Sequence, residues 1–352
     1  MDLTELQKQI TEPDRQSEAR AEKHWMQLAK PLSGLGKFET MVTQIAGIQR
    51  TEQIRLHKKA LLVFCADNGV VEEGVTQTGQ DVTAVVAGNF LKGETTACKM
   101  AQVAGVDLFP IDIGMIRDVE GVSRPEDKVA YGTKNMAKEP AMTRKEAWNA
   151  IETGIRKAKE RKAEGYQILL TGEMGIGNTT SAAVLAGRMV GLSAEEVTGR
   201  GAGLDGAGLQ RKRKVVEKAL EMPGVGSDVE AIWCRFGGLE LTAMMGIILG
   251  GGLYGIPVVL DGLLSLVSAE AAERLVPGIR EYMIPSHISR EPAARRLAES
   301  LELEPVLDAG MGAGEGAGAA MMMSLLRDVN RVYREAKRFD GYGMEPYTRY
   351  EE

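Results

Sequence analysis

The sequence predicts an α/β fold: a parallel, Rossmann-like sheet wrapped by helices, with a small helical domain formed by the N-terminal and C-terminal segments. Short apolar runs of strand length recur along the chain, and segments of helical periodicity lie between them. Each run leads into a glycine and an acidic residue, a combination typical of turns after strands. The 352 residues are enough to build a large core.

Four apolar runs supply the predicted strands, which cover residues 60–66, 106–111, 167–170 and 256–260. The segments of helical periodicity cover 144–164, 179–190, 208–222, 238–250, 263–274 and 319–337. Because each parallel connection must cross back over the sheet, this alternation favours a parallel sheet.

Acidic residues follow the predicted strands. They are Asp67, Asp112, Glu173 and Asp261, and a last short apolar run at 305–307 leads to Asp308 and then Glu315. Ligands of open α/β sheets bind beyond the carboxyl ends of the strands, so we expect these six carboxylates to outline one cleft. Taken alone, each Asp is better explained as a turn former or a helix cap.

Three divisions of the chain are predicted. Residues 1–54 are helical and rich in Gln, Lys and Glu, and we expect them to form a small domain with part of the C-terminal region. Residues 55–338 form the α/β catalytic domain, and 339–352 form a polar tail. The N-terminal segment is expected to pair with the C-terminal helix or with a second subunit.

Composition excludes several functions. The net charge is −6, and basic residues alternate with acidic ones outside the run 211–214, so a nucleic-acid partner is not expected. The chain opens with a polar helical segment instead of a signal peptide, which indicates a cytoplasmic protein. The uncharged stretch 241–260 is interrupted by glycines and Pro257, so it predicts a buried helix and strand, with no membrane partner.

Cofactor sites have little to build from. The three cysteines are far apart, as expected of buried thiols in a reducing compartment. None of the three histidines is paired with a cysteine at ligand spacing, so we expect no metal and no cofactor.

One carboxylate, Glu315, lies inside the segment Met-Gly-Ala-Gly-Glu-Gly-Ala-Gly at 311–318. Glycines let the backbone and a ligand approach closely, so Glu315 is a candidate working carboxylate. A solvated Glu in a flexible loop is the alternative.

A second motif, Thr-Gly-Glu-Met-Gly-Ile-Gly-Asn-Thr-Thr at 171–180, leads from a strand into a helix. The free amides and positive dipole of such a helix start suit a phosphate. The spacing matches neither the Walker loop nor the dinucleotide fingerprint, and an ordinary capped helix is the alternative. Lys212, which follows the glycine-rich segment 199–209, either reaches an anion or belongs to a solvated face.

Together these segments resemble one family, the nicotinate-nucleotide:dimethylbenzimidazole phosphoribosyltransferases. The matching segments occur in family order from about residue 30 to residue 335: 66–78, 171–180, 199–212, 236–240, 256–262, 286–287, 291–292 and 314–319. The resemblance implies transfer of phosphoribose from nicotinate mononucleotide to 5,6-dimethylbenzimidazole, with inversion from a β to an α N-glycosidic bond. It also implies a homodimer.

The resemblance implies a role for each candidate residue. Glu315 would be the general base that accepts the N–H proton of the attacking benzimidazole. The phosphate and ribose site would comprise Glu173, Gly175, Gly177, Asn178, Thr179 and Lys212. The pocket for the acceptor base would be bordered by Thr78, Gln80 and Ala313.

The chain departs from the family pattern beside Glu315. Relatives commonly have Arg-Leu-Gly-Glu-Gly-Thr-Gly, whereas Gly312, Ala313 and Ala317 replace the Arg, the Leu and the Thr. These losses leave the preferred acceptor open among dimethylbenzimidazole, benzimidazole, adenine and a phenol. A non-catalytic nucleotide-binding sensor is the alternative from another class.

Overall fold

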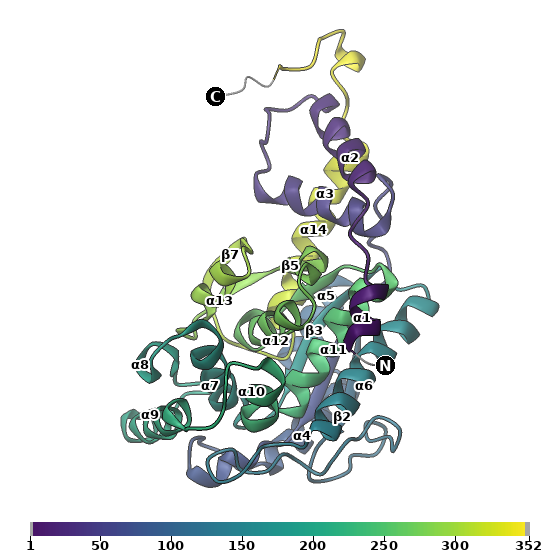
Figure 1. Ribbon diagram of the computed structural model, residues 1–352. Coiled ribbons are helices and arrows are strands. Elements are labelled where there is room, and N and C mark those ends of the chain that lie inside the picture. The colour runs from purple at the N-terminus through teal and green to yellow at the C-terminus, as the bar shows by residue number, and fades with distance from the viewer. Residues whose placement is uncertain (1–2, 349–352) are drawn as a thin grey trace.

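The computed structural model describes residues 3–348, and its centre is a parallel five-stranded sheet (Figure 1). The strand order is β2 (Asp107–Gly114), β1 (Lys59–Ala66), β3 (Ile168–Met174), β4 (Val258–Leu260) and β5 (Met283–Pro285). Every neighbouring pair is parallel, so the predicted α/β class is confirmed.

The strand predictions need two corrections. The predicted strands 167–170 and 106–111 continue to Met174 and Gly114, which puts Glu173 and Asp112 on their strands instead of after them. The edge strand β5 was missed because it has only three residues, Met-Ile-Pro, too few to show a period. A separate two-stranded parallel sheet, β6 (His287–Ser289) and β7 (Leu307–Met311), lies next in the chain.

The two faces of the sheet are covered by different helices. Alternate residues of β1 divide between two cores: Leu62 and Phe64 belong to one, and Leu61 and Val63 to the other. The first core is completed by α6 (Arg144–Ala163), α7 (Asn178–Val190), α10 (Val229–Phe236), α11 (Leu239–Tyr254), α12 (Gly262–Leu275) and α13 (Ala294–Ser300). The second is completed by α3 (Lys37–Gln49), α4 (Asp81–Lys92), α5 (Thr96–Ala104) and α14 (Ala317–Glu335).

The predicted buried helix at 238–250 is α11, which is apolar on all sides and packs on α6. The two backbones meet at glycines: a Cβ on Gly154 would lie 2.1 Å from the Ala243 carbonyl oxygen. Within residues 3–348 we find no helix long and apolar enough to cross a membrane. Two further helices, α8 (Ala194–Val197) and α9 (Gly206–Glu221), flank α7.

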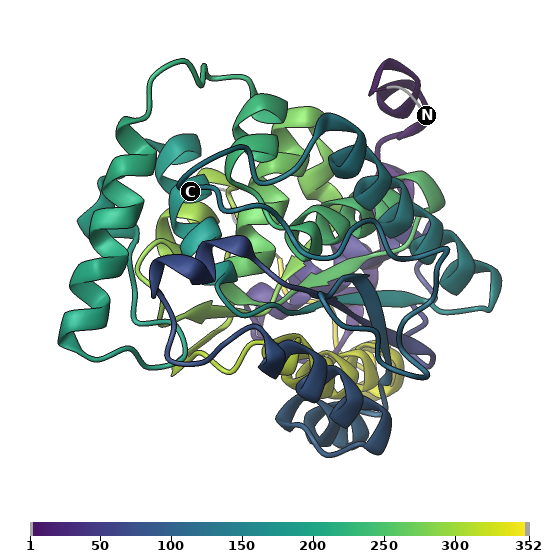
Figure 2. The ribbon, with the colours of Figure 1, turned by 90° about the horizontal axis from the view of Figure 1, so that it is seen from below.

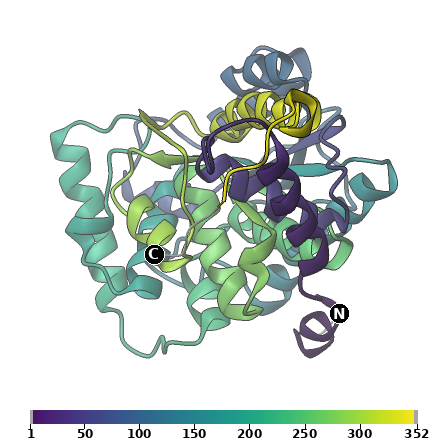
Figure 3. The same ribbon diagram turned by 90° about the horizontal axis from the view of Figure 1, so that it is seen from above.

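The longest C-terminal helix, α14, serves two regions. Its first half packs beside α5 against the sheet, as Figure 2 shows. Its far end meets α2 (Arg15–Gln27), as the ribbon in Figure 3 shows. There the Tyr333 ring lies 4.4 Å from the His24 ring and 4.8 Å from the Trp25 ring between centroids. The N-terminal and C-terminal segments are therefore in contact, while the boundaries at 54 and 338 stay predictions. The short helix α1 (Leu3–Gln9) precedes α2 in the chain.

Candidate active site

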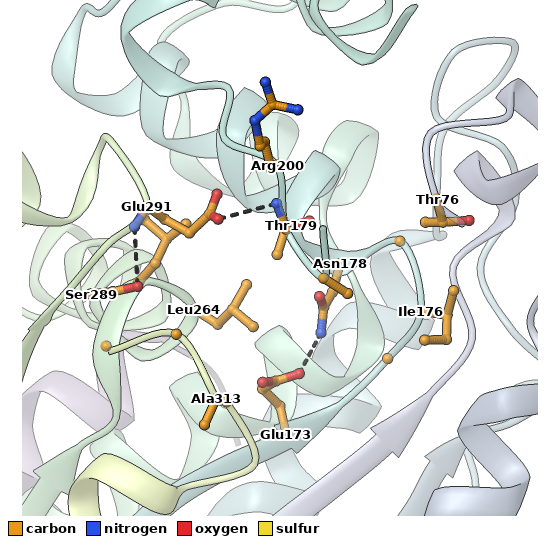
Figure 4. A pocket seen from close by; sticks show the side chains of 18 of the residues that line it. Thr76, Glu173, Ile176, Asn178, Thr179, Arg200, Leu264, Ser289, Glu291 and Ala313 are labelled. Atoms are coloured by element: carbon orange, nitrogen blue, oxygen red, sulfur yellow. Dashed lines mark hydrogen bonds between the residues drawn. The ribbon is translucent and has the colours of Figure 1, made fainter. Parts of the chain in front are cut away.

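A cavity of about 330 Å³ opens at the carboxyl ends of β3 and β4 (Figure 4). Four parts of the chain form its walls: the β3–α7 turn, the start of α12, the glycine segment 200–204 and the loop after β7. Residues 75–78, after the first strand, close one side. The cavity is therefore where the parallel topology predicts a ligand.

The β3–α7 turn presents backbone donors to the cavity. Gly177 has φ +95°, a left-handed conformation that a side chain would oppose. Its N–H finds no acceptor within residues 3–348. In the first turn of α7 the Thr179 N–H is likewise without an acceptor among the described residues, whereas the Asn178 and Thr180 N–H groups donate to the Gly175 and Gly177 carbonyl oxygens. The turn therefore offers an anion site at a helix start.

Lys212 reaches this helix start from α9. Its side chain is only 1% exposed, and its Nζ donates to Thr179 Oγ1 at 2.8 Å. It forms no ion pair among the described residues, and burial lowers the pKa of the Lys212 ammonium to about 8. An unpaired buried ammonium is costly without an anion beside it, which excludes the solvated-face alternative.

Glu173 lies on the floor of the cavity and is held by its neighbours. Asn178 Nδ2 donates to Glu173 Oε2, and the Glu315 N–H lies 3.5 Å from Glu173 Oε1. Burial raises the pKa of Glu173 to about 8, with further contributions from the carboxylates of Glu240 and Asp261. Near neutral pH Glu173 is therefore mostly protonated, so it can both donate and accept a hydrogen bond.

Glu315 projects from a strained loop. Its φ is +60°, between Gly314 at +71° and Gly316 at +86°. Such a conformation costs a non-glycine residue energy and persists where the surroundings impose it. Asp261 holds the loop in this conformation, because its Oδ2 accepts from the Gly316 N–H at 3.0 Å and its Oδ1 accepts from the Ala319 N–H at 2.9 Å.

One oxygen of the Glu315 carboxyl group is an unsatisfied acceptor: Oε2 is buried and has no hydrogen-bond partner within the described chain. Burial raises the pKa of Glu315, while Thr95 and Ala97 at the start of α5 act in the opposite direction. A carboxylate in this state gains by taking a proton.

Most of the predicted site residues meet in this cavity. It is lined by Thr78, Glu173, Gly175, Gly177, Asn178, Thr179, Lys212, Ala313 and Glu315. Gln80 lies outside the lining, and its Nε2 donates to the Asn68 carbonyl oxygen at 3.0 Å.

The expectation that six carboxylates outline the cleft is wrong for three of them. Asp67 is fully buried and accepts from the Ile116 N–H at 2.8 Å. Asp112 pairs with Lys128 at 2.9 Å behind the sheet edge. Asp308 is exposed and pairs with Arg295 at 2.8 Å. Of the six carboxylates, only those of Glu173, Asp261 and Glu315 belong to residues that line the cavity. Side-chain direction as well as strand position decides which residues reach it.

Glu291 and His287 both line the cavity, and no role was assigned to them from the sequence. Glu291 Oε1 accepts from the Gly201 N–H at 3.1 Å and so ties the glycine segment to the β6 side of the cavity (Figure 4). His287 lies beside Asp261, and its Nδ1 is 3.0 Å from Ser286 Oγ. Both residues lie in segments that match the family, 286–287 and 291–292, and that match was the sequence signal that could have identified them. Arg200 also lines the cavity, but its side chain is directed away from the centre (Figure 4).

Comparisons with known proteins agree with this site. A family model described as phosphoribosyltransferase matches residues 10–343. The fold and the anion site at a helix start therefore belong to an enzyme of the phosphoribosyltransferase class.

Individual relatives are more specific. The chain is 39% identical over 322 residues to the nicotinate-nucleotide–dimethylbenzimidazole phosphoribosyltransferase of Acetivibrio thermocellus, covering 91% of this chain and 92% of that protein. It is 36% identical to the protein of the same name from Ruminiclostridium cellulolyticum, over 99% of both chains. The crystal structure of CobT from Thermus thermophilus superposes with a TM-score of 0.87 at 38% identity, covering 94% of this chain and 99% of that one. The chain belongs to the nicotinate-nucleotide–dimethylbenzimidazole phosphoribosyltransferase family.

Proposed function

We propose that this enzyme transfers phosphoribose from nicotinate mononucleotide to 5,6-dimethylbenzimidazole. The products are α-ribazole 5′-phosphate and nicotinate, and the reaction belongs to synthesis of the lower ligand of cobalamin. The names of the relatives support the substrates, and the observation that carries the mechanism is that Glu315, whose pKa is raised by burial, lines the same cavity as the buried Lys212.

The 5′-phosphate would bind at the start of α7. The Gly177 and Thr179 amides, which have no acceptor among the described residues, would donate to its oxygens, and the Lys212 ammonium would supply the balancing charge. A phosphate there also removes the cost of burying that ammonium alone. This end of the cavity therefore fixes the nucleotide by its charge.

The ribose would lie over Glu173. Because the pKa of Glu173 is raised to about 8, its protonated carboxyl offers one donor and one acceptor to a pair of hydroxyl groups. A neutral carboxyl also adds no negative charge near the phosphate. This arrangement orients the anomeric carbon towards the acceptor side of the cavity.

The chemistry needs a base more than an acid. The pyridinium nitrogen of the nucleotide is cationic, so nicotinate leaves with the bonding electron pair and needs no proton. One benzimidazole nitrogen attacks the anomeric carbon from the opposite face, and the proton on the other nitrogen passes to Glu315. The bonds and charges balance without a metal or cofactor, and a positioned base of this kind is worth about 100- to 10,000-fold in rate.

A related acceptor is the second candidate. Gly312 and Ala313 are exposed at the cavity rim, where relatives commonly carry larger side chains, so the rim leaves room for another azole, adenine or a phenol. The preference is tested by supplying nicotinate mononucleotide with each acceptor in turn and identifying ribotides by mass spectrometry. We expect a benzimidazole product. No product from any acceptor, with the nucleotide bound, would contradict the proposed function.

Assembly and location are proposed with the function. We propose a homodimer in the cytoplasm, on the support of the family likeness. Light scattering of the purified protein tests the dimer.

A further inference from the structure

A buried carboxyl group that the proposed reaction does not use lies directly behind the glycine turn. Glu240, in the first turn of α11, is 0% exposed and does not line the cavity. A Cβ on Gly175 would lie 2.6 Å from Glu240 Oε1, so the carboxyl group abuts the backbone of the turn. Any charge on Glu240 therefore lies immediately behind the expected phosphate site.

Glu240 is joined to one side chain, Asn68, through one hydrogen bond. Asn68 Nδ2 donates to Glu240 Oε1 at 2.8 Å. The Asn68 side chain also touches the turn, since its Cβ is 3.4 Å from the position of a Cβ on Gly177. The pair Glu240–Asn68 thus supports both glycines of the turn.

The remaining oxygens of the pair are both without a donor. Glu240 Oε2 and Asn68 Oδ1 are buried, and neither has a hydrogen-bond partner among residues 3–348. Both lie against Gly238: the position of a Cβ on Gly238 is 2.9 Å from the first and 2.8 Å from the second. Two buried acceptors without donors are unfavourable, because each has lost its water without gaining a hydrogen bond.

One proton on Glu240 would give both oxygens a hydrogen bond. A protonated Oε2 donates to Asn68 Oδ1 while Oε1 keeps its bond from Nδ2, which makes the cyclic two-bond pairing of a carboxylic acid with an amide. An ionised Glu240 leaves Oε2 without a donor and has no ion pair in the described part of the chain.

The surrounding charges favour the same state. The charged group that acts on Glu240 is the Asp67 carboxylate, directly after β1, while the nearby Glu173 on β3 is mostly protonated in the same pH range. Burial raises the pKa of Glu240 to about 7, and Asp67 adds to the shift, while the bonds from Asn68 and from its own N–H act against it. The pair is thus neutral on the acid side of this value and negatively charged on the alkaline side.

We propose that Glu240 is a positioning residue that acts as a neutral acid: its proton, shared with Asn68, supports the 175–177 turn without placing a negative charge behind the bound phosphate. The inference rests on the proposed function in that the ligand of the turn is the 5′-phosphate. Loss of the proton leaves the two oxygens unbonded and adds a charge that repels the nucleotide. The affinity for the nucleotide therefore falls as pH rises through the pKa of Glu240.

Calorimetric titration with nicotinate mononucleotide and with inorganic phosphate, at pH values below and above about 7, tests the proposal. Wild-type affinity should fall on the alkaline side by on the order of tenfold, the size expected of one added charge behind the turn. Glu240→Gln keeps both hydrogen bonds and cannot ionise, so it should lack this component of the fall. Glu240→Ala lacks the carboxyl group and should bind the nucleotide weakly at every pH. Glu240→Gln should restore the affinity that Glu240→Ala loses.

Other ionisations are separated by matched variants. Lys212 loses charge near about pH 8 and is retained in all the Glu240 variants, so its contribution is common to them. Equal pH dependence of wild type and Glu240→Gln would overturn the positioning role. If no variant and no wild-type sample binds the nucleotide at any pH, the proposed function fails as well.

Infrared spectroscopy tests the proton without any ligand. Wild type minus Glu240→Gln should show the carbonyl stretching band of a protonated carboxyl group on the acid side of about pH 7, and the band should disappear on the alkaline side. If Glu240→Gln does not fold, ¹³C-glutamate labelling and a pH titration of the Glu173→Gln protein report the same band without the contribution of protonated Glu173. Absence of any protonated glutamate band that titrates near that pH would overturn the proposal.

Discussion

Two glycine-rich loops meet in the cavity, and they are built differently. The β3–α7 turn is mostly buried and tied on several sides: the Ile176 N–H donates to Thr83 Oγ1 at 3.3 Å, and Glu240 lies against Gly175. The loop after β7 is exposed at Gly312 and Ala313, and the Asp261 carboxylate holds its buried end at Gly316.

The difference teaches how the proposed reaction divides its tasks. The turn binds with backbone amides and one buried ammonium, groups that cannot change without changing the core. The β7 loop offers few side chains to a ligand, so substitutions at its rim alter contacts without disturbing the sheet. In the proposed reaction the nucleotide end is therefore constrained and the acceptor end is open to variation.

The sharpest test of the loop side is Glu315→Gln. We expect kcat to fall by about 100- to 10,000-fold, because the amide cannot take the azole proton. The Kd for nicotinate mononucleotide should stay unchanged in calorimetry, since the phosphate end is untouched. Glu299→Gln, an exposed glutamate on α13, is the matched control. Transfer at the wild-type rate would remove Glu315 from the role of base.

The sharpest test of the turn side is Lys212→Met. Loss of a charged hydrogen-bond donor should raise the Kd for nicotinate mononucleotide by about 10- to 100-fold. Binding of nicotinic acid riboside, which lacks the phosphate, should change far less. Lys214→Met removes an exposed lysine from the same helix and should bind normally. An equal loss for nucleotide and riboside would mean that Lys212 does not meet the phosphate.

Asp261→Asn tests how the β7 loop is held. The amide nitrogen cannot accept a hydrogen bond, so one of the bonds from Gly316 and Ala319 is lost and Glu315 is less well placed. We expect kcat to fall about tenfold, a misplacement effect smaller than loss of the base itself. Steady-state kinetics should show little change in KM for the nucleotide. A change confined to KM would indicate that Asp261 serves binding instead of the loop.

The smallest effect is expected at the rim. Ala313→Leu fills part of the acceptor side, and a few buried methyl groups are worth about 10-fold in discrimination between acceptors. Competition between dimethylbenzimidazole and adenine, followed by mass spectrometry, measures this ratio. Gln80→Ala is the comparison, because Gln80 lies outside the cavity lining. An unchanged acceptor ratio in Ala313→Leu would place the acceptor elsewhere.

Local patterns of the chain predicted much of this site. The alternation of apolar strands and helices predicted the parallel sheet, since it depends on period and length. Glu315 and Gly177 were recognised because glycines beside a polar residue mark close backbone approach, and both residues line the cavity.

Side-chain direction was the part that the sequence did not reveal. Asp67 follows its strand as predicted and Asp112 lies on β2, yet both form structural bonds, with the Ile116 N–H and with Lys128. Asp308 was misplaced because its strand, β7, belongs to a separate sheet. No local pattern encodes the contacts between distant segments that decide these directions.

The sequence by itself determined the class of fold, the glycine turn and the presence of Glu315, because strand period, helix period and glycine content are local properties. Only the tertiary structure decided the electrostatics. Lys212 becomes an unpaired buried ammonium because α9 packs on α7, and Glu240 meets Asn68 because α11 begins behind the β1 end of the sheet. The free energy of a charge depends on its distance from water and from other charges, and folding sets both distances.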